Sequence, residues 1–148
     1  TGLGHPNDVE KIKARIAALP AKERVLFKGF LATDEYYSVL NSCDIFCMTR
    51  VNSAFANAGF PFKLGEFLAS GKGVIATRVG DVPKYLHHQE NALLIKPDSV
   101  DEIVQALMTF IDNPAKIGEL GAGARKTAED NFDSDKVSMK LLSIFEAA

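Results

Sequence analysis

The segment Asn57–Thr77 constrains the fold of this chain more than any other. Gly59 and Pro61 interrupt the backbone pattern just before a run of apolar residues with helical spacing, so a loop is predicted to lead into a helix there. Gly71 stands where that helix should end. The stretch Gly73–Thr77 carries no charge, which is typical of a parallel strand covered on both faces.

Two opposite charges, Lys63 and Glu66, lie at the start of this predicted helix. Because they are three residues apart, they should point the same way, beside first-turn N–H groups that have no intrahelical acceptor. In open α/β sheets, ligands bind at such strand-to-helix loops. The pattern therefore predicts an anion site in which Lys63 contacts phosphate. For Glu66 the spacing alone leaves two readings, a ligand contact or a solvated ion pair with Lys63.

Strand-like and helix-like segments alternate along the rest of the chain. The predicted helices are Val9–Leu19, Asp34–Ser42, a segment opened by a Ser99–Glu102 capping box and running to Asp112, and Asp135–Ala147; the predicted strands are Val25–Phe30 and Asp44–Thr49. Such alternation indicates a parallel sheet with helices on both faces. The predicted fold class is α/β, a three-layer α/β/α Rossmann-like sheet, with residues 1–148 forming a single domain.

The remaining residues exclude several kinds of site. Cys43 and Cys47 are expected to be buried small hydrophobic residues, since no Cys or His partners are spaced for zinc. His87 and His88 are adjacent, so on a helix they cannot face one ligand, and both are assigned to the surface. The formal net charge of −2 does not favour nucleic acid as a partner. There is no apolar run long enough for a membrane span and no signal-peptide pattern, so a cytoplasmic location is expected.

The segment Asn57–Thr77 resembles the C-terminal half-domain of the retaining GT-B glycosyltransferases of family 4, the group 1 class. That family's pattern is a Glu, then Gly-Phe-Gly, then a helix bearing a second Glu, followed by a small residue, a glycine and a strand. Gly59, Phe60 and Glu66 fall at the matching positions, and Ala69–Ile75 matches the small-residue turn and strand.

The chain departs from this pattern at two positions. Ala58 stands where the family has its first Glu, and Pro61 replaces the second glycine. The arrangement of Pro61, Lys63 and Glu66 resembles a subgroup in which the lysine takes over part of the donor contact. The departure leaves open whether the first Glu was lost with activity or replaced by this arrangement.

The resemblance implies a donor site for a nucleotide-diphosphate sugar, with no metal or other cofactor. It places the base near Phe30 and Leu31, the ribose on Glu66, and the diphosphate on the backbone amides of residues 59–63. The candidate donor-binding residues are Asn57, Gly59, Phe60, Pro61, Phe62, Lys63, Leu64, Glu66, Phe30 and Leu31. No catalytic residue is identified.

Four of these candidates also have structural explanations. Gly59 is expected to need a positive φ or a close ligand approach. Phe60 and Phe62 are expected in the core more than against a ligand. Asn57 is expected to form a turn, and the alternative is a hydrogen bond to a sugar hydroxyl in place of the absent carboxylate.

The resemblance also implies more protein than this sequence contains. A strand, a helix and a second strand should precede it in the intact domain, and an N-terminal Rossmann domain should carry the acceptor site. That N-terminal domain is the expected partner and the expected route to any peripheral membrane association; the acceptor is not identified. Two other functions stay open: a GT-B-fold nucleotide-sugar epimerase, and a degenerate non-catalytic module.

Overall fold

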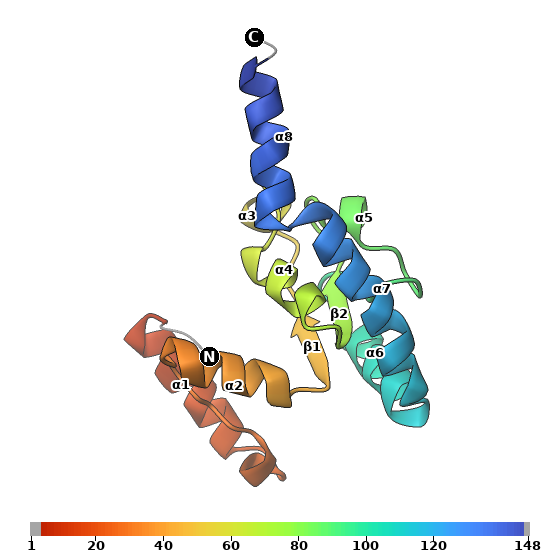
Figure 1. Ribbon diagram of the computed structural model, residues 1–148. Coiled ribbons are helices and arrows are strands. Elements are labelled where there is room, and N and C mark those ends of the chain that lie inside the picture. Colours follow the sequence, from red (N-terminus) through yellow and green to blue (C-terminus); the bar gives the residue numbers. More distant parts are fainter. Residues whose placement is uncertain (1–3, 147–148) are drawn as a thin grey trace. The chain divides into compact units, whose positions relative to one another are not determined.

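The computed structural model describes residues 4–146, which divide into two compact units (Figure 1). The first unit ends at Asn41 and the second begins at Ser42. The single domain expected from the sequence remains a prediction, and the two units are described separately below.

The first unit holds α1 (Pro6–Ala17), the short 3-10 helix η1 (Lys22–Arg24) and most of α2 (Thr33–Ser42). Proline lies in the first turn of α1, where its missing N–H removes no helical hydrogen bond. α1 and α2 confirm the helices predicted over Val9–Leu19 and Asp34–Ser42, and α2 begins one residue earlier than predicted, at Thr33.

The prediction of a strand over Val25–Phe30 is wrong, because this segment is not part of any sheet in the structure. A strand exists only when a neighbouring backbone completes its ladder of hydrogen bonds. Among the described residues none forms such a ladder with it, and Leu26 and Phe30 are 75% and 70% exposed. The segment has the apolar pattern of a strand, but no described segment forms backbone hydrogen bonds with it as a neighbouring strand would.

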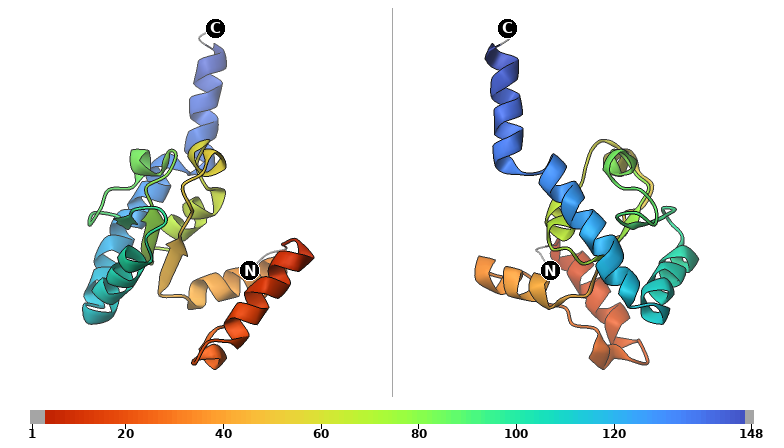
Figure 2. Two further views of the ribbon diagram at one scale, coloured as in Figure 1. Left: turned by 180° about the vertical axis from the view of Figure 1, so that it is seen from behind. Right: turned by 45° about the vertical axis from the view of Figure 1, so that its right-hand side comes forward.

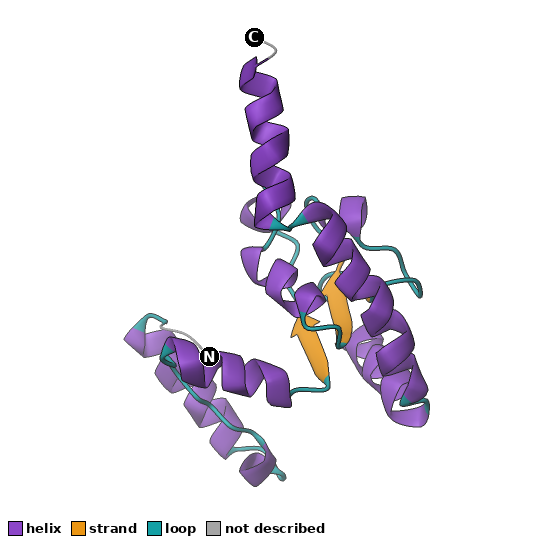
Figure 3. Ribbon diagram, viewed as in Figure 1, coloured by secondary structure: helices purple, strands orange, loops and turns teal. Residues whose placement is uncertain are grey.

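The second unit is built on a parallel sheet of three strands, β1 (Ile45–Met48), β2 (Gly73–Thr77) and β3 (Leu93–Ile95), in that order. Figure 3 shows β1 and β2 in orange among the helices. All residues of the central strand β2 are buried, as its uncharged sequence predicted. The strand predicted over Asp44–Thr49 is confirmed as β1.

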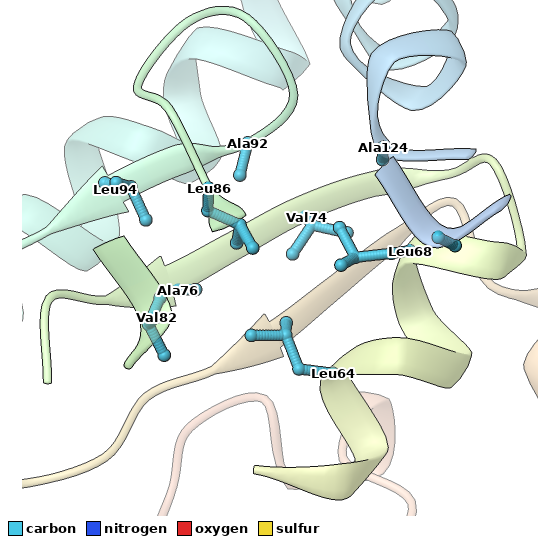
Figure 4. Packing of buried hydrophobic residues seen from close by; sticks show 10 residues of the cluster. Leu64, Leu68, Val74, Ala76, Val82, Leu86, Ala92, Leu94 and Ala124 are labelled. Atoms are coloured by element: carbon cyan, nitrogen blue, oxygen red, sulfur yellow. The ribbon is translucent and has the colours of Figure 1, made fainter. Parts of the chain in front are cut away.

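Helices cover both faces of this sheet. The helices that lie wholly in the second unit are α3 (Ala54–Asn57), α4 (Phe62–Ala69), α5 (Val82–Tyr85), α6 (Val100–Asp112), α7 (Ala115–Asn131) and α8 (Ser134–Glu146), of which α4 to α7 contribute to the two cores. On one face Val74 and Ala76 of β2 pack with α4, α5 and α7 (Figure 4). On the other face Ile75 packs with Phe110 of α6 and Leu120 of α7. The alternation of side chains along β2 thus builds two cores, and the three-layer α/β/α class is confirmed.

The capping box predicted at the start of α6 is half formed. The Ser99 hydroxyl accepts a hydrogen bond from the Glu102 N–H at 3.3 Å. The Glu102 carboxylate does not complete the box; it accepts from the Lys96 N–H at 2.7 Å and pairs with the Lys96 ammonium at 3.1 Å. Glu102 therefore ties the end of β3 to the start of α6.

The last helix, α8, extends from the C-terminal end of α7 (Figure 2). It buries none of its residues, and its apolar side chains are exposed, among them Met139 at 63% and Phe145 at 70%. The helix confirms the predicted Asp135–Ala147 segment, of which Ala147 lies outside the described residues. Within residues 4–146, no helix is both long enough and apolar enough to cross a bilayer.

Candidate functional site

The carboxyl ends of the three parallel strands meet at one edge of the sheet, so the loops that follow them are neighbours. The buried Thr77 at the end of β2 fastens this edge. Its hydroxyl accepts from the Arg50 N–H at 3.0 Å and lies 3.4 Å from the Met48 carbonyl oxygen, to which it donates. The loop after β1 then passes through α3 and enters α4.

The N-terminus of α4 is formed as the sequence predicted, directly after the loop containing Gly59. Pro61 is the N-cap residue, so no side chain caps the first-turn N–H groups of Phe62 and Lys63. Lys63 is exposed in this turn. The backbone N–H groups and the ammonium group together provide positive charge for an anion.

A cavity of about 860 Å³ lies beside α4 and contains Glu66 and two other predicted residues, Phe60 and Phe62. Its remaining lining residues come from α4, α5, α7 and the start of α8: Gly65, Ala69, Tyr85, Arg125, Ala128, Glu129, Asn131, Phe132, Asp133, Ser134 and Val137. Lys63 is not part of this lining, so it and Glu66 do not share one cavity. The residues from α7 and α8 could not be connected with α4 from local sequence patterns, because they lie about 60 residues further along the chain.

Phe60 and Phe62 differ in their surroundings. The ring of Phe60 packs against Tyr85 and Phe132, with centroids 5.2 and 5.0 Å apart, so its expected core position is confirmed. The same expectation is wrong for Phe62, which is 96% exposed. Leu64 and Leu68 form the buried face of α4, and a residue two positions before Leu64 lies on the opposite side of the helix. Leu64 itself is fully buried in the core.

The expectation that Gly59 needs a positive φ is wrong. Gly59 lies outside the left-handed region, and a Cβ at this position would face open space. The turn that requires glycine is at Gly80, where φ is +51°. A Cβ there would overlap the carbonyl oxygen of Gly59 and lie 2.9 Å from that of Ala56. Open space at Gly59 is compatible with the close ligand approach that was the other expectation.

Asn57, the last residue of α3, uses both ends of its carboxamide within the protein. Its Nδ2 donates to Oδ1 of Asn52 at 2.8 Å. Its Oδ1 accepts from the Gly80 N–H at 3.1 Å. Asn57 therefore connects the loop after β1 with the turn after β2.

The other predicted positions belong to other segments of the chain. Phe30 and Leu31 belong to the first unit, so their role at the base remains a prediction. Cys47 is exposed, contrary to expectation, because β1 is an edge strand of the sheet and is less covered than β2. Cys43 is half-buried, and neither cysteine forms a disulfide within the described residues.

His87 and His88 are exposed, as assigned. Nδ1 of His88 accepts from the Leu94 N–H at 3.0 Å, so this histidine holds the start of β3. Across residues 4–146, no group of three or more His, Cys, Asp or Glu side chains is arranged to hold a metal ion.

Residues 3–127 match the family model of the glycosyl transferases group 1. The chain belongs to this family. Among relatives of this group 1 glycosyltransferase chain is an MMP alpha-(1->4)-mannosyltransferase of Mycolicibacterium hassiacum, 28% identical over 134 residues, which are 90% of this chain and 31% of the relative. Another is a GDP-mannose-dependent alpha-(1-6)-phosphatidylinositol monomannoside mannosyltransferase of Mycobacterium tuberculosis, 27% identical over 122 residues, 80% of this chain and 31% of the relative. The chain thus spans about a third of the length of these relatives.

Several solved structures have a similar fold. The Anabaena protein HepE in complex with UDP-glucose superimposes with a TM-score of 0.86 at 23% identity, over 99% of this chain and 40% of HepE. The C-terminal domain of a group 1 glycosyltransferase of Francisella tularensis gives a TM-score of 0.74 at 22% identity, over 88% of this chain and 66% of that one. The fold is that of the C-terminal half of a GT-B glycosyltransferase.

Proposed function

We propose that this chain is the donor-binding domain of a retaining glycosyltransferase that transfers a sugar, in the manner of a hexosyltransferase, from a nucleotide-diphosphate sugar to an acceptor. The observation that carries the proposal is the uncapped N-terminus of α4 at the carboxyl edge of the sheet, with Lys63 in its first turn and Glu66 in its second, in a chain of the group 1 family. The acceptor site belongs to an N-terminal domain of the intact protein, and this chain alone does not catalyse transfer.

The donor is assigned to the elements around α4. Its diphosphate lies on the N–H groups at the start of α4 and beside the Lys63 ammonium, where the helix dipole adds to the charge. The Glu66 carboxylate accepts hydrogen bonds from the two ribose hydroxyls with its two oxygens. Phe30 and Leu31 lie near the base. A relative named as GDP-mannose-dependent and a structural neighbour solved with UDP-glucose support nucleotide-diphosphate sugars as the donor class.

The domain contributes to catalysis by stabilising the leaving group. As the glycosidic bond breaks, negative charge grows on the departing diphosphate. The backbone dipoles of α4 and the Lys63 ammonium are already oriented toward that charge, so they stabilise the transition state more than the bound donor. Transfer by this route requires no metal ion, and positioning of donor and acceptor relative to each other supplies the rest of the acceleration.

A second candidate function rests on Ala58, which stands where a carboxylate is expected for the family pattern. In that case the domain is a degenerate module that binds a partner and catalyses nothing. The third candidate function is that of a GT-B-fold nucleotide-sugar epimerase, which would release free nucleotide without forming a glycosylated product.

The proposal is tested on the intact protein with a panel of UDP-, GDP- and ADP-sugars, by thermal shift. A ligand bound only by the folded state raises the melting temperature by mass action. At least one sugar nucleotide should raise it, and the matching free nucleoside should not. Absence of a shift with every member of the panel contradicts donor binding and favours the degenerate module. Release of nucleotide without a glycosylated product would support the epimerase.

A further inference from the structure

A continuous set of hydrogen bonds connects the loops that follow all three strands. The Asn52 N–H, after β1, donates to Oδ2 of Asp98, after β3, at 3.1 Å. The Asn52 side chain accepts from Asn57, and Asn57 accepts from the Gly80 N–H after β2. We call Asp98, Asn52, Asn57 and Gly80 the loop bridge.

The loop bridge ends where the proposed diphosphate site begins. Asn57 immediately precedes residues 58–63, the loop that carries the N–H groups and Lys63. Gly80 packs directly on the Gly59 carbonyl, and the Asp81 N–H donates to the same oxygen at 3.5 Å. The position of this loop is therefore fixed from the turn after β2 as well as from β1.

Backbone conformation at the other end of the bridge fits the same role. Asp98 has a φ of +61°, a left-handed conformation that is uncommon for residues other than glycine. Such conformations persist only where surrounding contacts hold them. The hydrogen bond from the Asn52 N–H to the Asp98 carboxylate is one such contact.

We propose that Asn57 is a positioning residue, which holds the loop 58–63 in the geometry that binds the donor diphosphate but does not itself contact the donor. The proposal rests on the proposed function. A side chain at position 57 must donate a hydrogen bond to Asn52 and accept one from the Gly80 N–H. Only a carboxamide of this length does both.

The exposure of the bridge makes the proposal testable. Hydrogen bonds between exposed groups contribute little to global stability, because water satisfies the partners once the bond is lost. Removing the Asn57 carboxamide should therefore disturb the loop without unfolding the protein. A direct donor contact and a positioning role then differ in what happens when Asn52 is changed instead.

The experiment uses the intact protein and four variants: Asn57→Ala, Asn52→Leu, the double variant, and Asn113→Ala as a control. Asn52→Leu keeps the size of the side chain and removes the acceptor for Asn57. Asn113 is exposed at the end of α6 remote from the carboxyl edge of the sheet. Affinity is measured for UDP-glucose and for GDP-mannose, and exchange of the Gly80 amide hydrogen is measured without ligand.

A positioning role predicts that both single variants weaken binding of the nucleotide sugar that the parent binds, by about threefold to tenfold, the scale of one lost hydrogen bond. The double variant should lose no more than either single variant. The Gly80 amide should exchange faster in Asn57→Ala, while the melting temperature and Asn113→Ala stay at the parent values.

Additive losses, or full affinity in Asn52→Leu beside weak binding in Asn57→Ala, would overturn positioning and indicate a direct contact. Full affinity in both single variants would overturn it as well. If the parent binds neither of these nor any other sugar nucleotide of the panel, the proposed function fails instead. Unchanged Gly80 exchange in Asn57→Ala would then reject the bridge itself, and faster exchange would show that it holds the loop.

Discussion

Gly121 of α7 lies so close to Gly71 that a Cβ at position 121 would overlap the Gly71 carbonyl oxygen. Gly71 has a φ of +69° and follows the C-terminal end of α4. One turn further along α7, Nη1 of Arg125 donates to the Ala69 carbonyl at 2.7 Å. α7 thus reaches the α4–β2 connection through a position without a side chain, and this close approach explains why a glycine stands inside the helix.

Gly121→Ala should lower the free energy of unfolding by about 2 kcal/mol, because the added methyl group forces backbone apart in a packed region. Gly118 lies in the same helix with open space at its Cβ position. Gly118→Ala should therefore raise the free energy of unfolding by about 0.5–1 kcal/mol through helix propensity. Urea unfolding measures the free energy of unfolding of both variants. Equal changes in the two variants would contradict the close packing at Gly121.

Glu66→Gln in the intact protein should weaken donor binding by about 1–3 kcal/mol, the scale of a charge-assisted hydrogen bond. Titration calorimetry with the sugar nucleotide that binds the parent measures the loss. Glu119→Gln, on the exposed side of α7, is the matched control and should bind as the parent does. Parent-like affinity in Glu66→Gln would remove this carboxylate from the ribose site.

Lys63→Met keeps the apolar stem and deletes the charge. It should lower kcat more than it raises KM, since the diphosphate carries more negative charge in the transition state than in the bound donor. Steady-state kinetics separates the two constants, and Lys140→Met on α8 serves as control. A rise in KM alone would mean uniform binding, and no change in either constant would exclude the phosphate role.

Ala58→Glu restores the carboxylate of the family pattern at an exposed position that follows α3, so the fold should tolerate it. If Lys63 and the loop bridge form a working arrangement, a carboxylate beside the donor phosphates is repelled and activity should fall. Transferase assays of the intact protein decide the matter. Activity that appears or rises in this variant would indicate a degenerate parent.

Glu102 provides a pH-dependent contribution to stability. Its hydrogen bond from the Lys96 N–H, followed by its contact with the Lys96 ammonium, lowers the pKa of the carboxyl group. A lowered pKa in the folded state stabilises the protein above the ordinary pKa, and the contribution is lost as pH falls through the lowered value.

Glu102→Gln should therefore unfold at lower urea concentration than the parent at pH 7, and the difference should shrink below about pH 4. Urea unfolding across this pH range measures it, with Glu119→Gln as control. A difference that is constant with pH would assign the effect to the Gln side chain rather than to charge.

Local patterns were sufficient for the elements whose signals are contained in one short segment. The uncharged strand Gly73–Thr77, the Ser99 cap and the helix end before Gly71 all follow from neighbouring residues. The segment Val25–Phe30 shows the limit, because a strand depends on a partner that its own sequence does not contain.

In the candidate site, too, some features follow from neighbouring residues and others depend on residues far apart in the sequence. The N-terminus of α4 and the glutamate in its second turn could be read from spacing. The loop bridge could not, since Asn52 and Asp98 are 46 residues apart and meet only because parallel strands bring their loops to one edge. The glycine that the turn requires was likewise sought at Gly59, although the close approach is at Gly80.

The exposed helix α8 gives one wall of the cavity an unusual property. An isolated helix of this length is marginal in water, and α8 buries none of its residues, so its helical state depends on a few contacts, such as the Lys136 ammonium donating to the Glu129 carbonyl oxygen of α7 at 2.7 Å. Ser134 and Val137, in its first turn, line the cavity beside Glu66. A molecule that contacts this wall should add to the support of the helix. Occupancy of the cavity and the helicity of the chain's end are therefore linked quantities.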